Sequence, residues 1–269
     1  MSSKTASWLP AGAALTFAAA VSLAGPTLAQ PFAPPPGPPY PLPAEKTQDV
    51  LYKEFGGMWV MNNRISIEKY ETIPQPLQPK YQAMKEKLIA DRAAGKQVFT
   101  SDAQCIPQGM PRQMDGNFEA VVRPTSLGLF TGGSSMQVRN IWLDGRKHTP
   151  EEDLFETFSG ESIGHWEGDT LVVDTTGLRE TNEILYGVKG RHLHVIERIH
   201  KTGPDALQID TVVEDPAVFT KPWTYTFTYK RSKTQVLNEQ NYCTAALDRE
   251  VDKNGVEIFN LTPPPLPDQ

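Results

Sequence analysis

The chain has 269 residues, a formal net charge of −6 at pH 7 and a hydrophobic content of 39%. That many apolar residues can build a folded core, which excludes a wholly disordered protein. The negative charge disfavours nucleic acid and anionic membrane surfaces as partners, because both repel an acidic protein at long range.

The first 29 residues predict a secretory signal peptide. Lys4 supplies a positive charge, residues 11–23 form an apolar run, and Thr27-Leu28-Ala29 offers a small-residue cleavage site. The apolar run is shorter than a membrane span requires, so we expect cleavage and a soluble protein in the periplasm or outside the cell. An uncleaved N-terminal anchor is the alternative.

Proline content divides the rest of the chain. Residues 30–46 contain a dense run of prolines that predicts an extended leader, and residues 263–269 predict a second proline-rich tail. Between these segments, residues 47–262 are predicted to form a single domain.

The first part of this domain combines a strand with a helix. Residues 58–67 alternate loosely between apolar and polar types and predict a first strand. Tyr81, Met84 and Leu88 then fall near one helical face, so we predict one helical excursion over about 79–94.

The remainder of the domain is predicted to be almost entirely β. Turn signals such as Glu167-Gly168-Asp169 separate short apolar or alternating runs. The predicted strands are 118–123, 127–130, 136–143, 163–166, 170–175, 193–200, 206–213 and 224–231. So many sequential strands favour an antiparallel meander that closes into a barrel, because closure removes the exposed edges. A β-sandwich is the alternative.

A Gly-x-Trp motif, Gly57-Met58-Trp59, stands on the first predicted strand, and the same spacing recurs at Gly164-His165-Trp166. The first copy resembles the motif that lipocalin-like barrels carry on their first strand. The resemblance implies that the barrel is lipocalin-like.

Cys105 and Cys243 are the two cysteines of the chain. An oxidising compartment permits a disulfide between them, which would stabilise the fold by roughly 4–5 kcal/mol in the chain-entropy model. Two buried free thiols are the alternative. A cysteine nucleophile is not expected, because no histidine lies near either residue in the sequence.

Glu197 stands out on the strand predicted over 193–200. Leu193, Val195 and Ile199 share its face of that strand, so a carboxylate is placed among residues that point into the core. A buried carboxylate must be paired, hydrogen-bonded or protonated. One interpretation is a structural ion pair with an inward arginine such as Arg139; the other is a general acid or base that lines a ligand cavity.

His192 and His194 are two residues apart, a spacing that places two imidazoles on one face of a strand. A zinc or other divalent metal would need a third ligand, for which His148 or His165 is a candidate. The preferred interpretation is a metal-free site, in which His194 lines a cavity or makes hydrogen bonds.

Two arginines and three tryptophans complete the candidate site. Guanidinium groups can hold a carboxylate or phenolate of a ligand through paired hydrogen bonds. An exterior position is the alternative for Arg139. The candidates are Arg112 and Arg139 for an anionic group and Trp59, Trp142 and Trp166 for apolar walls.

The sequence contains no Gly-rich phosphate loop, Gly-x-Ser-x-Gly elbow or dinucleotide fingerprint, which argues against kinases, α/β-hydrolases and nicotinamide dehydrogenases.

Longer motifs resemble a family of exported bacterial proteins of sphingomonad and acidobacterial type. The similarity covers about residues 50–245 and lies in 105–112, 139–148, the SIGHWEGDTLVVDT stretch at 162–175, LHVIER at 193–198, and 214–223. This family has no characterised reaction, so the resemblance implies kinship and export only. Its Leu-His-Val-x-Glu-Arg pattern includes His194 and Glu197 but not His192, and the chain departs from the family from Asn241 onward.

The leading functional hypothesis is an exported barrel that acts on a small, partly apolar organic molecule, aromatic or carboxylated. It would use acid–base chemistry of lyase, isomerase or hydratase type without a redox cofactor, with Glu197 or His194 moving the proton. A non-catalytic lipocalin-like carrier is the first alternative. An envelope-associated structural protein, held to partners by its proline-rich tails, is the second.

Overall fold

The computed structural model describes residues 47–63, 72–96, 101, 106–132, 136–185, 188–190, 192–237, 250–251 and 257–258. The predicted signal peptide, the proline-rich leader and tail, and both cysteines of the predicted disulfide lie outside these residues.

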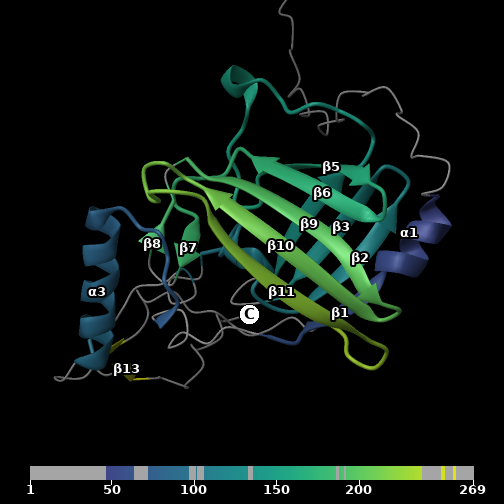
Figure 1. Cartoon of the computed structure of the whole chain (residues 1–269). Coiled ribbons are helices and arrows are strands. Elements are labelled where there is room, and N and C mark those ends of the chain that lie inside the picture. The colour runs from purple at the N-terminus through teal and green to yellow at the C-terminus, as the bar shows by residue number, and fades with distance from the viewer. Residues whose placement is uncertain are drawn as a thin grey trace, which may run out of the picture. The chain divides into compact units, whose positions relative to one another are not determined.

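Nine strands form a closed barrel, in the order β1-β11-β10-β9-β6-β5-β4-β3-β2 (Figure 1). The barrel strands are β1 Gly57–Met61, β2 Phe118–Arg123, β3 Ser126–Thr131, β4 Gln137–Trp142, β5 Glu161–Glu167, β6 Thr170–Thr176, β9 His194–Gly203, β10 Ala206–Glu214 and β11 Trp223–Ser232. The lipocalin-like barrel predicted from the sequence is therefore confirmed, and the sandwich alternative is not.

Smaller elements connect or flank the barrel strands. The helices are α1 Gln48–Phe55 and α3 Pro79–Ala93, with short 3-10 turns η2 Arg112–Met114 and η3 Glu151–Asp153. Two-residue and three-residue strands form separate pairs, β7 Glu183–Leu185 with β8 Val188–Lys189 and β12 Glu250–Val251 with β13 Glu257–Ile258. None of the helices in the described part of the chain has the length and hydrophobicity that a membrane crossing requires.

One pairing in the barrel is parallel, which a pure meander does not contain. β4 pairs with β5 only at Ile141–Ser162 and Trp142–Ile163. A parallel pair needs a crossover connection, and here residues 143–160, which carry η3, supply it. All other neighbouring barrel strands are antiparallel.

Strict alternation decides which side chains enter the barrel. Along β10, Leu207, Ile209, Thr211 and Val213 are buried, and the intervening residues are half-buried on the outer face. This is the two-residue period of a strand with one face on a core. The same rule applied to β9 puts Glu197 inside and His194 outside.

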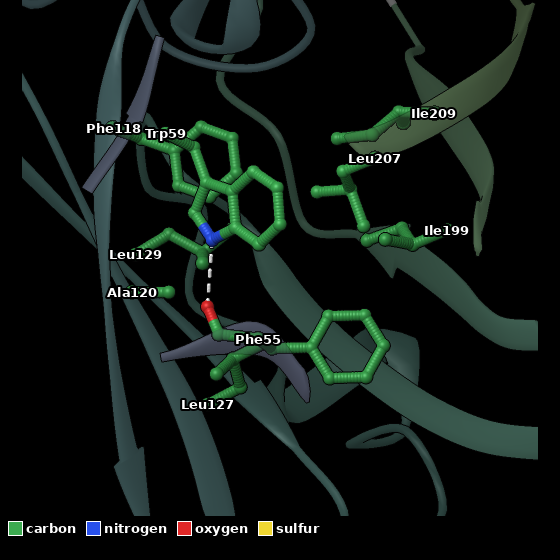
Figure 2. Close-up of a pocket in the computed structure, with 9 residues that line it drawn as sticks. All are labelled: Phe55, Trp59, Phe118, Ala120, Leu127, Leu129, Ile199, Leu207 and Ile209. Carbon is green, nitrogen blue, oxygen red and sulfur yellow. Dashed lines mark hydrogen bonds between the residues drawn. The ribbon is translucent and has the colours of Figure 1, made fainter. Parts of the chain in front are cut away.

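α1 and Trp59 close one end of the barrel. The Trp59 indole Nε1 donates a hydrogen bond to the Phe55 carbonyl at 2.7 Å, and the Arg231 guanidinium lies 4.7 Å from the Trp59 ring centre. The void that Phe55, Trp59 and the inward aliphatic side chains line has a volume of about 10 Å³ (Figure 2). That is room for about one water molecule, so side chains fill this end of the interior.

The helical excursion predicted over about 79–94 is confirmed as α3. It begins at Pro79, where proline fits the first helical turn, and it buries Tyr81. The preceding segment contacts the connection between β10 and β11 through an isolated bridge between Leu77 and Phe219. Most of the remaining α3 side chains are exposed or half-buried, so the helix contributes little to the core.

Candidate functional site

Glu197 and Arg139 form an ion pair inside the barrel, and both side chains are 0% exposed. The Arg139 Nη2 donates to the Glu197 carboxylate and, at 2.9 Å, to Thr175 Oγ1, while Arg139 Nε donates to Ser162 Oγ at 2.9 Å. Three strands, β5, β6 and β9, thus supply partners for one guanidinium. This arrangement matches the structural ion-pair interpretation, and it places Arg139 in the interior rather than on the barrel exterior.

The buried pair also affects the tyrosines of β11. Burial, together with the nearby Glu197 charge, raises the pKa of Tyr229 well above its usual value. The phenol therefore stays neutral and donates a hydrogen bond to the Met114 carbonyl at 2.5 Å.

His194 lies on the opposite face of the same strand, on the outside of the barrel. Its side chain is 33% exposed. Its Nδ1 is 3.0 Å from Glu214 Oε2 on β10, and its Nε2 is 3.1 Å from Asp174 Oδ1 on β6. The ring is thus held between carboxylates from the two neighbouring strands.

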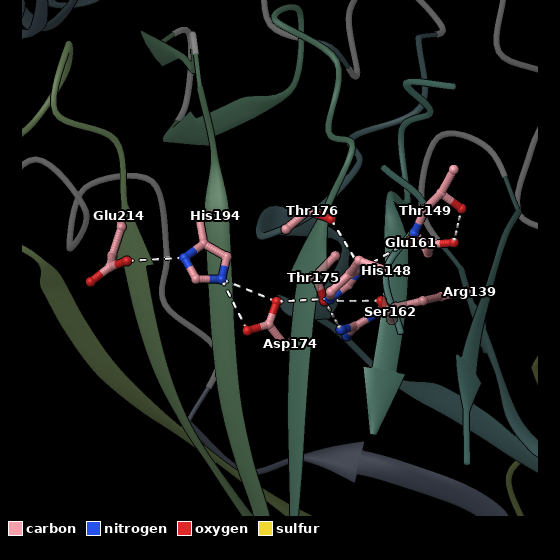
Figure 3. A network of polar contacts seen from close by, with 10 residues as sticks. All are labelled: Arg139, His148, Thr149, Glu161, Ser162, Asp174, Thr175, Thr176, His194 and Glu214. Atoms are coloured by element: carbon pink, nitrogen blue, oxygen red, sulfur yellow. Dashed lines mark hydrogen bonds and ion pairs between the residues drawn. The ribbon is translucent and has the colours of Figure 1, made fainter. Parts of the chain in front are cut away.

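Asp174 joins His194 to a second histidine. His148 Nε2 is 3.0 Å from the same Asp174 Oδ1, and His148 Nδ1 is 3.0 Å from Glu161 Oε2. We call Glu161, His148, Asp174, His194 and Glu214 the imidazole–carboxylate chain. Figure 3 shows these side chains in one row across neighbouring strands, with Asp174 between the two imidazoles.

Neighbouring groups shift the pKa values of His194 and Glu161 in this chain. Burial lowers the pKa of His194, but contacts with Glu214 and Asp174 outweigh it, so that the pKa is raised above its ordinary value. Burial raises the pKa of Glu161. Hydrogen bonds from the Thr149 backbone and hydroxyl and from His148 lower it by more, so the net pKa shift is downward. The raised pKa makes His194 a stronger proton acceptor than a free imidazole.

The histidines considered as metal ligands, which are His192 and His194 with His148 or His165, are not grouped into one cluster. His148 and His194 lie on either side of Asp174, and the backbone N–H of His192 donates to Asp215 Oδ2 at 3.0 Å. Among the residues that the structure describes, no three His, Cys, Asp or Glu side chains are grouped as metal ligands. The polar groups here form a line instead of a coordination shell.

A cleft of about 390 Å³ opens beside His194 on the outer surface. Its walls include His192, His194, Glu214, Phe219, Lys221 and Pro222. The cleft thus combines an imidazole, an ammonium group and apolar surface, and its volume lies in the range of small-molecule sites.

The remaining predicted site residues lie elsewhere. Arg112 is buried and pairs with Glu183 of β7, so it does not reach the cleft. Trp59 is a core residue, and Trp166 packs against the core 5.6 Å from Phe55. Trp142 lines a different outer cleft, of about 420 Å³, with Arg146 stacked 3.8 Å from its ring centre. The structure therefore does not bring the three tryptophans into one pocket.

Sequence reasoning did not select Asp174, Glu214 or Lys221. Asp174 and Glu214 are outward residues on strands with a regular inward apolar pattern, a position where a carboxylate is ordinary. Their meeting with His194 depends on the register that aligns β6 and β10 with β9. Only the alternation itself, which turns both side chains outward, was visible in the sequence.

Comparison with known proteins gives no further assignment: neither the family models nor the curated proteins contain a match to this chain. The geometry of the outer face therefore carries the functional argument.

Proposed function

We propose that the protein is an exported barrel that acts on a small, partly apolar organic molecule in the cleft beside His194, by acid–base chemistry without a redox cofactor. The observation that carries the proposal is the position of His194, which lines the cleft while Asp174 holds its far nitrogen at 3.1 Å. A carboxylate on one ring nitrogen fixes the orientation of an imidazole and stabilises its protonated form.

His194 is the proposed proton carrier. Its Nδ1 contacts Glu214, whose side chain is 41% exposed and also lines the cleft. An exposed carboxylate can rotate into water at little cost, and polar contacts in empty active sites often rearrange when a substrate binds. A ligand could thus replace Glu214 at Nδ1 and exchange a proton with His194.

Lys221 and the apolar wall indicate the kind of molecule. The ammonium group of Lys221 can attract a carboxylate, and Phe219 and Pro222 offer surface to an aromatic or alkyl group. Small carboxylates with an apolar part are therefore the proposed ligands. Glu197 and Arg139 support the barrel wall in this account and do not contact the ligand.

The same cleft could hold a ligand without changing it, as a carrier would. We place the ligand in the outer cleft rather than beside Trp59, because the void there measures about 10 Å³. Export to the periplasm rests on the N-terminal sequence pattern and remains part of the proposal. The structural role of the proline-rich tails stays a prediction, since those segments lie outside the described residues.

Deuterium exchange can test the proposed chemistry. The full chain is incubated in D2O with phenylpyruvate and levulinate, and NMR follows deuterium uptake at the carbon next to the keto group. We expect catalysed uptake with at least one probe, and a loss of roughly 100-fold in His194→Gln, the lower range for a general acid–base group. The matched control is His165→Gln, because that side chain is 61% exposed and does not line the cleft.

Three results separate the alternatives. Equal rates in the wild type and His194→Gln would contradict the role of His194. Binding of the probes without exchange would favour the carrier. Neither binding nor exchange with any of these carboxylates would contradict the proposed ligand class.

A further inference from the structure

The imidazole–carboxylate chain extends beyond the cleft. His194 lines the cleft, whereas His148 does not, and Asp174 lies between them with contacts of 3.1 and 3.0 Å to the two Nε2 atoms. The His148 side chain is 28% exposed. A second imidazole thus has access to water at a point that a ligand in the cleft would leave uncovered.

We propose that Asp174 and His148 form a proton path that connects His194 to solvent while the cleft is occupied. This inference rests on the proposed function, and it assigns His148 as a positioning residue that acts through His194. A bound ligand would cover the cleft side of His194, so a proton taken from the ligand would need another exit.

The proton movements balance along the path. His194 Nδ1 accepts a proton from the ligand, and the proton on His194 Nε2 passes to Asp174 Oδ1. Asp174 then transfers that proton to His148 Nε2, which can accept it when the ring carries its own proton on Nδ1, and Nδ1 releases its proton to water. One proton enters and one leaves, and no electron transfer or additional reactant is needed.

Charged and polar groups from several strands and loops surround both imidazoles. His194 faces Asp174 on β6 and Glu214 on β10, with His192, Asp215 and Lys221 around the adjoining cleft. His148 faces Asp174 and Glu161, and the Thr176 hydroxyl lies 3.1 Å from its Nδ1.

Arg146 adds a positive charge that interacts with Glu161. Asp174 is the group that both rings share, because it is the carboxylate in contact with each of them. The protonation of His194 should therefore depend on the presence of His148 through Asp174.

NMR of the histidine ring nitrogens in the free full chain tests this coupling without any ligand. His148→Gln removes the competitor for Asp174, so we expect the titration midpoint of His194 to rise by about 0.5 pH unit. Asp174→Asn should lower that midpoint by about one pH unit or more. His165→Gln should leave it unchanged. An unchanged His194 midpoint in His148→Gln would overturn the proposal.

Rescue by added imidazole distinguishes proton transfer through His148 from a purely structural role of that residue. In the deuterium-exchange assay at low buffer concentration, His148→Gln should slow uptake by roughly tenfold, and added imidazole buffer should restore it. Slowed uptake that imidazole does not restore would overturn the path. If the wild type shows no exchange, the proposed function fails, and the ring titrations still decide whether the two histidines are coupled.

Discussion

Glu197 and His194 are three residues apart on β9 and face opposite sides of the barrel wall. The Glu197 side chain is 0% exposed and bonded to Arg139, whereas the His194 side chain is 33% exposed and bonded to Asp174 and Glu214. An odd spacing on a strand places two side chains on opposite faces. Glu197 and His194, which were both candidates for the same site, therefore lie in different environments, one in the core and one on the outer face.

Glu197→Gln is expected to lower the free energy of unfolding by about 3–5 kcal/mol, because the Arg139 guanidinium would remain buried without its counter-charge. Urea unfolding followed by circular dichroism measures this loss. Glu119→Gln is the control, since Glu119 is an exposed outward residue of β2 and should cost less than about 0.5 kcal/mol.

Replacing both partners tests the same pair in the opposite direction. The double variant Arg139→Met with Glu197→Met should be more stable than Glu197→Gln alone, because it leaves no unpaired buried charge. If Glu197→Gln keeps the stability of the wild type while abolishing turnover, Glu197 would be catalytic and our assignment of the site would be wrong.

The strands were predictable because their signals are local. Residues 206–213 were predicted from alternation alone, and β10 spans Ala206–Glu214. α1 was not predicted, because it has only eight residues and is fixed by the burial of Leu51 and Phe55. The parallel β4–β5 pair was missed for a related reason, since it depends on how residues 143–160 cross the barrel surface.

The site was predictable only in part. The alternation on β9 placed Glu197 in the core and suggested Arg139 as its partner, and the structure contains that pair. The partners of His194 come from β6 and β10, and the sequence does not reveal the registers that align them. The same limit applies to Lys221, which enters the cleft from the segment between β10 and β11.

Gly160 should tolerate substitution less well than Gly168. Both have positive φ angles, 67° and 61°, so alanine should cost about 1–2 kcal/mol at either position. A Cβ at Gly160 would also lie 2.5 Å from the Thr176 carbonyl, whereas nothing lies within 4 Å at Gly168. Thermal unfolding should show a loss for Gly160→Ala that exceeds the loss for Gly168→Ala by about 1–3 kcal/mol. Equal losses would contradict the close packing at this crossover.

Stability should decline as the pH rises above about 6.5 and through the raised pKa of His194. Contacts with Glu214 and Asp174 outweigh desolvation and raise this pKa, so the folded protein binds the proton more tightly than the unfolded chain. The stabilisation is complete below the unfolded pKa, about 6.5, and is lost as pH rises through the folded pKa. Urea unfolding across this range should show a shallower decline in His194→Gln than in the wild type or His165→Gln. Parallel pH profiles for all three proteins would contradict the assignment.

Lys221→Gln should weaken the binding of benzoate by roughly tenfold, because it removes the cation that would attract the carboxylate. Isothermal titration calorimetry measures the affinity. Lys230→Gln is the matched control, since Lys230 is exposed on β11 and does not line the cleft. Equal affinities for the two variants would show that Lys221 does not hold the ligand.

NMR mapping of benzoate distinguishes a ligand bound in the outer cleft from one bound inside the barrel. The ring nitrogens of His192 and His194 report on the cleft, and the Trp59 indole N–H, bonded to Phe55, reports on the interior. We predict that benzoate shifts the two histidine signals and leaves the Trp59 signal unchanged. A shift at Trp59 with unchanged histidines would place the ligand in the interior and contradict this account.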